Sequence, residues 1–485
     1  MTDDLISKII PICLFYNVPK LLSIFSDFHY TKGKVLSVIL SMTQPIRISD
    51  HFGYRRLLRF TLPTMAMMVF TSIYGIVDGI FVSNFAGKTP FAAVNLIMPF
   101  LMVLGVLGFM LGTGGSALVA KTLGEGDHDK ANRIFSMLVL AGFLSGILFS
   151  LLGILFLPRV TLFLGAKGEM VSLCVTYGRI ILVALPFFIL QNMFQALLVT
   201  AEKPRLGLQI TIVAGCLNIL LDFLMIGVWH MGVSGAALAT AISQTVGGLI
   251  PAIYFLLPNR SLLRITTPST DFRAYLQSCY NGMSEFFGNV SASIVSMCYN
   301  YQLMRFIGED GVSAYGVIMY VQFIFFSIFM GFTVGSAPIV SYHYGAGNHA
   351  ELHNLFTRSL RMIGGMGLLI VLTMELLSRP LTQLFVGYDE QLFLLTCRAF
   401  RIYCLSYFLV GFNFYASSFF TALNNGALSA VISTVRTMVF EIAAVFVLPI
   451  LLGPENIWFS IVFAEAMSLL LSSALLITNR KRYHY

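Results

Sequence analysis

The sequence predicts an all-α polytopic membrane protein with twelve transmembrane helices in two six-helix bundles, related by a pseudo-two-fold axis along the membrane normal. Three observations lead to this fold class. The chain of 485 residues is 57% hydrophobic and only 11% charged, its apolar residues gather in long uninterrupted runs, and its second half repeats its first at a fixed offset.

The composition excludes most classes of soluble protein. Soluble domains carry about 25% charged residues, whereas this chain combines 43 Phe and 23 Met with a mean hydropathy of +0.83. The net charge of +8 is spread through the gaps between apolar runs, without the basic patches typical of nucleic-acid binding. We therefore expect membrane lipids as partners and no nucleic acid.

The apolar runs give the elements in order. Each is about 20 residues or longer, which is enough to cross a membrane as a helix, whereas a membrane β-barrel would alternate over about 10 residues. Twelve such runs are separated by polar residues, Gly or Pro, at 57–84, 91–120, 134–157, 171–200, 207–229, 233–257, 275–304, 312–342, 355–377, 392–421, 427–451 and 456–478.

Loop charges predict the orientation. Basic residues are concentrated in the loops on the side of the N-terminus, and the loops of the opposite side hold only Lys88, Arg159, Lys167, Arg305 and Arg379. Because Lys and Arg are enriched in cytoplasmic loops, we expect a multi-pass membrane protein with both termini in the cytoplasm.

The predicted runs also divide the chain into regions. We expect residues 1–50 to form a cytoplasmic or interfacial segment, because their acidic start and their prolines do not fit a secretory signal. The sequence does not decide whether residues 1–41 belong to the functional protein. The remaining regions are an N-lobe with helices 1–6 (51–260), an inter-lobe cytoplasmic loop (261–274), a C-lobe with helices 7–12 (275–480) and a cytoplasmic tail (481–485).

An offset of 221 residues superposes the two halves without a gap. Its clearest match is polar: Gly-Glu-Gly-Asp-His at 124–128 and Gly-Ala-Gly-Asn-His at 345–349 each follow the second helix of a half. Six helices per half is an even number, so both halves enter the membrane from the same side. Two parallel bundles around a central cleft favour a transporter that works by alternating access. No catalytic constellation is present, so we expect no enzymatic activity and no cofactor.

Few ionisable residues fall within the apolar runs, and each is a functional candidate because a charge in the bilayer is costly. Asp78 lies in the first run. Asp222 lies in the fifth, with Asn218 four residues earlier on the same helical face. The offset from these acids leads to Tyr299 and Ala443, so the acids are not part of the repeated scaffold. They could hold a proton in one conformation and release it in another, or furnish oxygen ligands to Na⁺. The sequence does not separate H⁺ from Na⁺.

In the second half, four ionisable residues within the runs are singled out, while Glu375 lies near the end of its run beside Arg379 and is interpreted as a pair that reaches the membrane surface. Glu285 is in the seventh run. Arg436 and Glu441 share the eleventh and could neutralise one another, whereas Glu465 in the twelfth has no evident partner, and its role stays unassigned.

Several of these stretches resemble the bacterial branch of the multidrug and toxic compound extrusion (MATE) family, over about residues 50–480. The resemblance rests on 62–87 around Val77-Asp78-Gly79, on Leu217-Asn218 through Asp222, on Gly232 to Thr240 and on the paired Gly-rich loops. It implies a twelve-helix antiporter that exports amphipathic, often cationic organic compounds against an inward flow of H⁺ or Na⁺.

The resemblance also implies roles for single residues. Asp78, Asn218, Asp222 and Thr240 are similar to the family's N-lobe cation site, and Gln195 stands where an Asn is common. Glu285 resembles a secondary acid found in the C-lobe of some members, but Asn413 replaces their Asp, which favours the N-lobe as the coupling site. We expect no other metal site, and a chain that functions as a monomer.

The alternative is a flippase for lipid-linked oligosaccharides or other lipids, from a related superfamily. Such a protein would need a basic cleft for pyrophosphate, for which Arg179 and Arg401 are the candidates.

Overall fold

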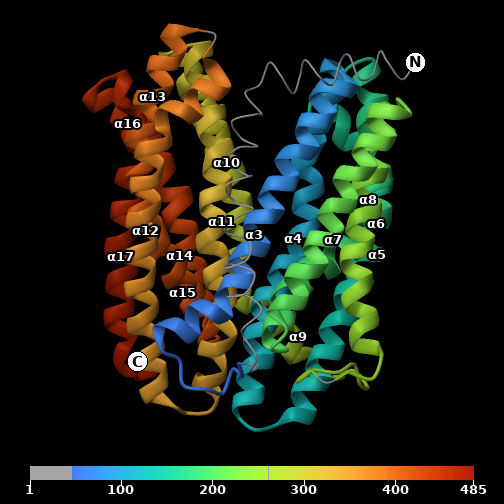
Figure 1. Cartoon of the computed structure of the whole chain (residues 1–485), viewed down its shortest axis with the longest axis vertical. Coiled ribbons are helices and arrows are strands. Elements are labelled where there is room, and N and C mark those ends of the chain that lie inside the picture. Colours follow the sequence, from blue (N-terminus) through green and yellow to red (C-terminus); the bar gives the residue numbers. More distant parts are fainter. Residues whose placement is uncertain (1–45, 260, 388) are drawn as a thin grey trace, which may run out of the picture. The chain divides into compact units, whose positions relative to one another are not determined.

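A computed structural model describes residues 46–259, 261–387 and 389–485, and its compact unit runs from Ile48 to Tyr485. The predictions made for residues 1–45 lie outside the described residues. Within the described ranges the regular elements are all helical, in two bundles that follow the two halves of the chain (Figure 1). The predicted fold class is confirmed.

The N-lobe contains six spans. Two of them end in a π-helical turn, marked η, in which the backbone winds more widely than in an α-helix. The elements are α3 (Tyr54–Phe81) with η1 (Val82–Ala86), α4 (Lys88–Gly124), α5 (His128–Phe163), α6 (Glu169–Thr200), α7 (Pro204–Asp222) with η2 (Phe223–Val228), and α8 (Gly232–Leu256).

The C-lobe has more breaks. Its elements are α9 (Phe272–Asn281), α10 (Met283–Phe306), α11 (Glu309–Gly345), α12 (His349–Val386), α13 (Glu390–Cys404), α14 (Tyr407–Ala422), α15 (Gly426–Thr434), the π-helical η3 (Val435–Glu441), α16 (Ile442–Leu452), the 3₁₀ turn η4 (Pro454–Phe459) and α17 (Ser460–Tyr483).

Ten helices of the described chain are long and apolar enough to span a membrane by themselves, and the pair α13 and α14, bent by 44°, makes an eleventh span. The helix α10 has 24 residues, the length of a further span, but it includes Glu285, Asn289 and several serines and is less apolar than the others. Two predicted runs are therefore not single straight helices: 275–304 breaks at Gly282 between α9 and α10, and 392–421 breaks at residues 405–406.

The repeated Gly-x-Gly loops have the same structure in both lobes. Gly126 and Gly347 adopt positive φ angles of 88° and 65°, which favour glycine. The next residue then caps the following helix: Asp127 accepts a hydrogen bond from the Lys130 N–H, and Asn348 accepts one from the Glu351 N–H. In both lobes the repeated Gly-x-Gly residues and the Asp or Asn that follows them therefore end one helix, form a turn and start the next helix.

The first glycine of each loop brings the two lobes together. A Cβ added at Gly124 would lie 2.0 Å from the Tyr342 carbonyl oxygen, and one at Gly345 would lie 2.1 Å from the Lys121 carbonyl oxygen. These contacts are reciprocal, as a pseudo-two-fold axis requires. We call this part of the molecule, where α4 and α11 end, the Gly124/Gly345 end.

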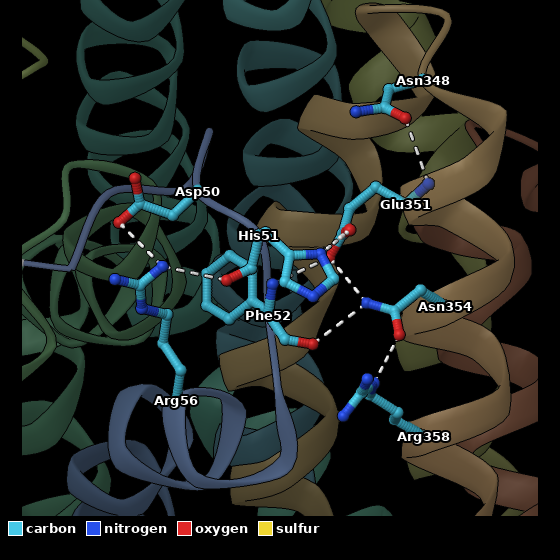
Figure 2. A network of polar contacts seen from close by, with 8 residues as sticks. All are labelled: Asp50, His51, Phe52, Arg56, Asn348, Glu351, Asn354 and Arg358. Atoms are coloured by element: carbon cyan, nitrogen blue, oxygen red, sulfur yellow. Dashed lines mark hydrogen bonds and ion pairs between the residues drawn. The ribbon is translucent and has the colours of Figure 1, made fainter.

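A short segment before α3 contacts both lobes at the Gly124/Gly345 end, and Figure 2 shows its contacts with α12. The Ile48 N–H donates to Glu202 of the N-lobe at 2.8 Å. The Phe52 N–H donates to Glu351 of α12 at 2.9 Å, and His51 Nδ1 lies 2.6 Å from the second oxygen of the same carboxyl. Asn354 of α12 donates to the Phe52 carbonyl oxygen at 3.0 Å. Residues 48–52 therefore form an inter-lobe strap; the sequence assigns 48–50 to the N-terminal segment and 51–52 to the N-lobe.

Candidate functional site

The N-lobe brings three of the predicted residues into one cluster. Asp78 of α3 and Asp222 at the end of α7 lie with their carboxyl groups in contact, and the Thr240 hydroxyl of α8 lies beside Asp78. Asp222 is fully buried. Among the described residues, neither oxygen of Asp222 has a hydrogen-bond partner, and neither has Oδ1 of Asp78 or the Thr240 hydroxyl.

Asn218, a fourth predicted residue, lies one turn before Asp222 on α7. It is 2% exposed, and its side-chain nitrogen has no hydrogen-bond partner in the described part of the chain. Buried polar groups without partners are costly. Asp78, Asp222 and Thr240 therefore present unpartnered oxygens that a small cation or proton can complete. The unpartnered Asn218 nitrogen is a hydrogen-bond donor and cannot bind a cation.

Three further residues belong to this cluster: Tyr74, which the sequence places on the same helical face as Asp78, and Tyr177 and Gln191, which sequence reasoning missed. The Tyr177 ring of α6 lies next to both carboxyl groups and Thr240, while Tyr74 of α3 lies next to Asp78 and contacts Gln191 of α6. The Gln191 side-chain oxygen is buried and unpartnered within the described structure. The spacing of Tyr74 and Asp78 by one turn was the available signal; nothing in the sequence around Tyr177 or Gln191 points to Asp78.

Gln195, the fifth predicted residue, lies one turn beyond Gln191 on α6 and is 7% exposed. It lines a small cavity of about 10 Å³ together with Gln191, Met67 and Thr211. Among the hydrogen bonds of the described residues, none joins Gln195 to Asp78 or Asp222.

The C-lobe corrects one sequence interpretation. Arg436 of η3 does not pair with Glu441: its Nε donates to Glu465 of α17 at 2.7 Å, and its guanidinium stacks 4.3 Å from the centre of the Phe414 ring. Asn413 donates to the other Glu465 oxygen at 2.7 Å. Glu465 thus has the partners that the sequence did not show, and Asn413 positions it.

Beside this pair lies a cavity of about 340 Å³, which we call the C-lobe cavity. Glu285, Arg436 and Glu441 all line it. Glu441 is only 7% exposed, and among the described residues its carboxyl oxygens make no hydrogen bond or ion pair. A few residues of α4 and α6, among them Thr113 and Ala196, also border the cavity, so it faces the N-lobe.

The candidates for a basic cleft lie elsewhere. Arg179 is exposed on α6. Arg401 on α13 is 48% exposed and lies 3.6 Å from Glu375. Neither residue lines the C-lobe cavity, so the described residues around this cavity do not form the basic site that pyrophosphate would need.

The chain is similar to curated export proteins over most of its length. It is 24% identical over 431 residues to the multidrug export protein MepA of Staphylococcus haemolyticus, a match that covers 88% of this chain and 94% of that protein. It is 22% identical over 433 residues to MepA of Staphylococcus aureus, with the same coverage.

Solved structures show the same fold. One is the outward-facing conformation of a multidrug resistance MATE family transporter of the MOP superfamily, with a TM-score of 0.84, 22% identity, and coverage of 90% of this chain and 97% of that one. Another is a MOP superfamily transporter from Pyrococcus furiosus, with a TM-score of 0.82, 22% identity and the same coverage.

The family model MatE matches the chain twice, over residues 63–224 and 286–447. The two matches start 223 residues apart, close to the offset of 221 read from the sequence, and each falls within one lobe. Together they span more than half of the chain, and the chain therefore belongs to the MATE family.

Proposed function

We propose that this chain is a cation-coupled secondary active antiporter that exports amphipathic, often cationic organic compounds across the bacterial cytoplasmic membrane by alternating access. An inward flow of H⁺ or Na⁺ drives it, and it acts as a monomer because one chain supplies both lobes. The names of the relatives, which are multidrug export proteins, support the cargo class.

The observation that carries the proposal is the contact between Asp78 and Asp222. Two adjacent carboxyl groups that have no basic partner among the described residues cannot both keep an uncompensated charge. Binding of one proton or one Na⁺ cancels one of the two negative charges, so the packing of α3 against α7 depends on whether the ion is present. The oxygens of Asp222, Asp78 and Thr240 are the hard ligands that Na⁺ would use.

The helix geometry lets ion binding act on the lobe. The π-helical turn η2 begins at Phe223, directly after Asp222, and η1 begins four residues after Asp78. Single π-helical turns inside α-helices are often found at functional sites. A change in the charge of the carboxyl pair therefore reaches two spans at the points where they are least regular.

Transport into liposomes tests this function. Uptake of ethidium is followed under an imposed pH gradient and, separately, under an imposed Na⁺ gradient. We expect uptake under one of the two, lost in Asp78→Asn and in Asp222→Asn and kept in Asp129→Asn, an exposed carboxyl of the same lobe. Full uptake in both cluster variants would refute the coupling role, and no uptake under either gradient would favour the lipid flippase.

A further inference from the structure

Two arginines of α12 converge on the first residue of α3. The Arg358 guanidinium stacks on the Tyr54 ring, with its central carbon 4.7 Å from the ring centre, and Nη1 of Arg361 donates to the Tyr54 hydroxyl at 3.0 Å. The Nε of Arg358 donates to the Asn354 side chain, which in turn donates to the Phe52 carbonyl oxygen of the strap (Figure 2). Because α3 belongs to the N-lobe and α12 to the C-lobe, these contacts cross between the lobes.

The partners of these arginines are neutral. An amide, an aromatic ring and a hydroxyl hold the two guanidinium groups in place, and neither group pairs with a carboxyl group in the described ranges. Arg55, which follows Tyr54 on α3, is exposed, and its guanidinium makes no hydrogen bond or ion pair with the described residues. The nearby acids are engaged elsewhere: Glu351 holds the strap, and Asp50 lies 3.9 Å from Arg56. Three positive charges from two helices therefore remain uncompensated around one tyrosine.

The start of α3 adds to this positive charge. Its N-cap, Gly53, makes no side-chain hydrogen bond, and the first turn of the helix contains no acidic residue. A Cβ added at Gly53 would lie 3.8 Å from Nη1 of Arg358, so this guanidinium lies at the N-terminal end of α3. Such an end carries a partial positive charge and N–H groups without intrahelical partners. The combined field favours an anion, and the paired N–H donors of arginine suit a phosphate group.

The arginines lie where the apolar part of each helix begins. No charged side chain occurs on α3 from 60 to 77 or on α12 from 362 to 374. Both helices then expose leucines, among them Leu58 and Leu62 at successive turns of α3 and Leu369 on α12. Exposed leucines of a membrane helix contact acyl chains, and a tyrosine beside them is typical of the membrane–water interface. The arginines are therefore at the depth of the lipid headgroups.

We propose that Arg55, Arg358 and Arg361, arranged around Tyr54, bind the phosphate of an anionic phospholipid in the leaflet at the Gly124/Gly345 end. The acyl chains of this lipid lie along the exposed leucines of α3 and α12. The loop charges predict that this leaflet faces the cytoplasm, and basic pockets between membrane helices on that side bind anionic headgroups. The inference goes beyond the proposed function, because it does not depend on the driving ion or on the cargo.

A lipid at this site bridges the two lobes. Arg55 belongs to the N-lobe, whereas Arg358 and Arg361 belong to the C-lobe, so one phosphate can contact all three only while α3 and α12 stay together. A ligand shifts a conformational equilibrium toward the form that it binds better. Anionic lipid is therefore expected to favour the form that is closed at the Gly124/Gly345 end.

Native mass spectrometry of the purified full chain in a neutral detergent tests the inference, because it counts the lipids bound to each protein. Phosphatidylglycerol is compared with phosphatidylcholine of the same acyl chains. We expect the wild type to hold one phosphatidylglycerol more tightly than any phosphatidylcholine. Arg55→Gln should weaken this first lipid about fivefold, the effect of one basic residue at a membrane surface. The triple variant Arg55→Gln, Arg358→Gln, Arg361→Gln should lose the preference altogether.

A matched control removes the same charge from other places. Lys130, Arg264 and Arg273 are exposed and lie on the side predicted for the basic loops, and replacing all three by Gln should leave the preference unchanged. Equal loss in this control would show that net charge alone attracts the lipid, which would overturn the site. If the triple variant does not fold, the wild type and Arg55→Gln still decide, because the exposed Arg55 guanidinium has no partner to lose among the described residues.

Two other outcomes would also contradict the inference. A wild type that binds both lipids equally has no site for an anionic headgroup. Displacement of phosphatidylglycerol by inorganic phosphate at equal concentration would mean that the arginines take a free phosphate instead of a lipid.

Spin-label distances across the Gly124/Gly345 end test the bridge itself. In nanodiscs, phosphatidylglycerol should shift the wild type toward shorter distances than phosphatidylcholine does, and it should not shift the triple variant. Equal distances of the wild type in both lipids would show that the bound lipid does not hold the lobes together.

Discussion

At the scale of single residues, Arg436 and Glu465 form an ion pair buried between η3 and α17, with side chains 10% and 1% exposed. Removing one partner of a buried pair leaves the other charge uncompensated and costs about 3–5 kcal/mol. We expect Arg436→Met to lose stability of this order, because Glu465 would keep only the Asn413 amide. Glu465→Gln should lose less, because Arg436 still has the carboxyl of Glu441 nearby.

Thermal unfolding of the purified protein in detergent measures both variants. The double variant Arg436→Met with Glu465→Gln should recover part of the loss, since neither of the paired charges then remains alone. Melting temperatures equal to the wild type in both single variants would show that the pair contributes nothing to stability.

The residue scale also shows what the sequence could predict. An acidic residue inside an apolar run can be recognised from the sequence alone, so Asp78 and Asp222 could be predicted as candidate site residues. The partner of Arg436 could not be predicted from the sequence. Glu441 is five residues away and Glu465 is on another helix, and only the packing of the helices decides which of the two carboxyl groups Arg436 contacts. Tyr177 and Gln191 were hidden for the same reason: their roles come from α6 packing against α3 and α8.

At the scale of helices, the glycines of the Gly124/Gly345 end are a packing requirement. A methyl group at Gly345 would meet the Lys121 carbonyl oxygen at 2.1 Å, so α4 and α11 must separate to admit it. We expect Gly345→Ala to shift the protein toward a form that is open at this end. Gly316→Ala on the same helix is the control, because nothing lies within 4 Å of its added Cβ.

Distances between spin labels on the loops after α4 and α11 can measure this opening. The Gly345→Ala distance distribution should move to longer values, and that of Gly316→Ala should match the wild type. Identical distributions in all three proteins would mean that the glycine contact does not hold the lobes together.

The strap before α3 depends on Glu351, which accepts hydrogen bonds from the Phe52 N–H and the Asn354 side chain and pairs with His51. We expect Glu351→Ala to release residues 48–52 and to raise their amide exchange by at least about tenfold, because the Phe52 N–H loses its acceptor. Lys130→Ala, at the corresponding position of the N-lobe repeat, should leave this exchange unchanged. Unaltered exchange in Glu351→Ala would show that burial of Phe52 alone holds the strap.

At the scale of helices, the irregular turns and bends could not be predicted from the sequence. Hydrophobic runs predict that a span exists, but not that it winds as a π-helix at 223–228 or 435–441, or that it bends by 44° between α13 and α14. Whether a helix takes a π-helical turn or a kink depends on local insertions and side-chain contacts that a hydrophobic run does not record. The π-helical turn η2 directly follows Asp222, and η3 contains Arg436 and Glu441.

At the scale of the whole molecule, the repeat in the sequence was sufficient to predict two lobes, because an offset of 221 residues fixes which helices correspond. It could not predict which polar side chains each half brings together. The paired loops remain nearly identical, since both must meet at the pseudo-two-fold axis, whereas the polar interiors differ. The proposed transport by alternating access would require the shared contact at the Gly124/Gly345 end to break in each cycle.

A reversible cross-link across that contact tests the requirement. Cysteines replace the exposed residues Glu125 and Ala346 in a chain whose native cysteines are substituted, and a cleavable bismaleimide joins them. We expect gradient-driven uptake of ethidium to stop on cross-linking and to return when the linker is cleaved. The control pair Glu125 and Asp129 places both cysteines in one lobe and should transport throughout. Continued uptake by the cross-linked inter-lobe pair would mean that the lobes need not separate at this end, and that the substrate moves by a rearrangement within one lobe.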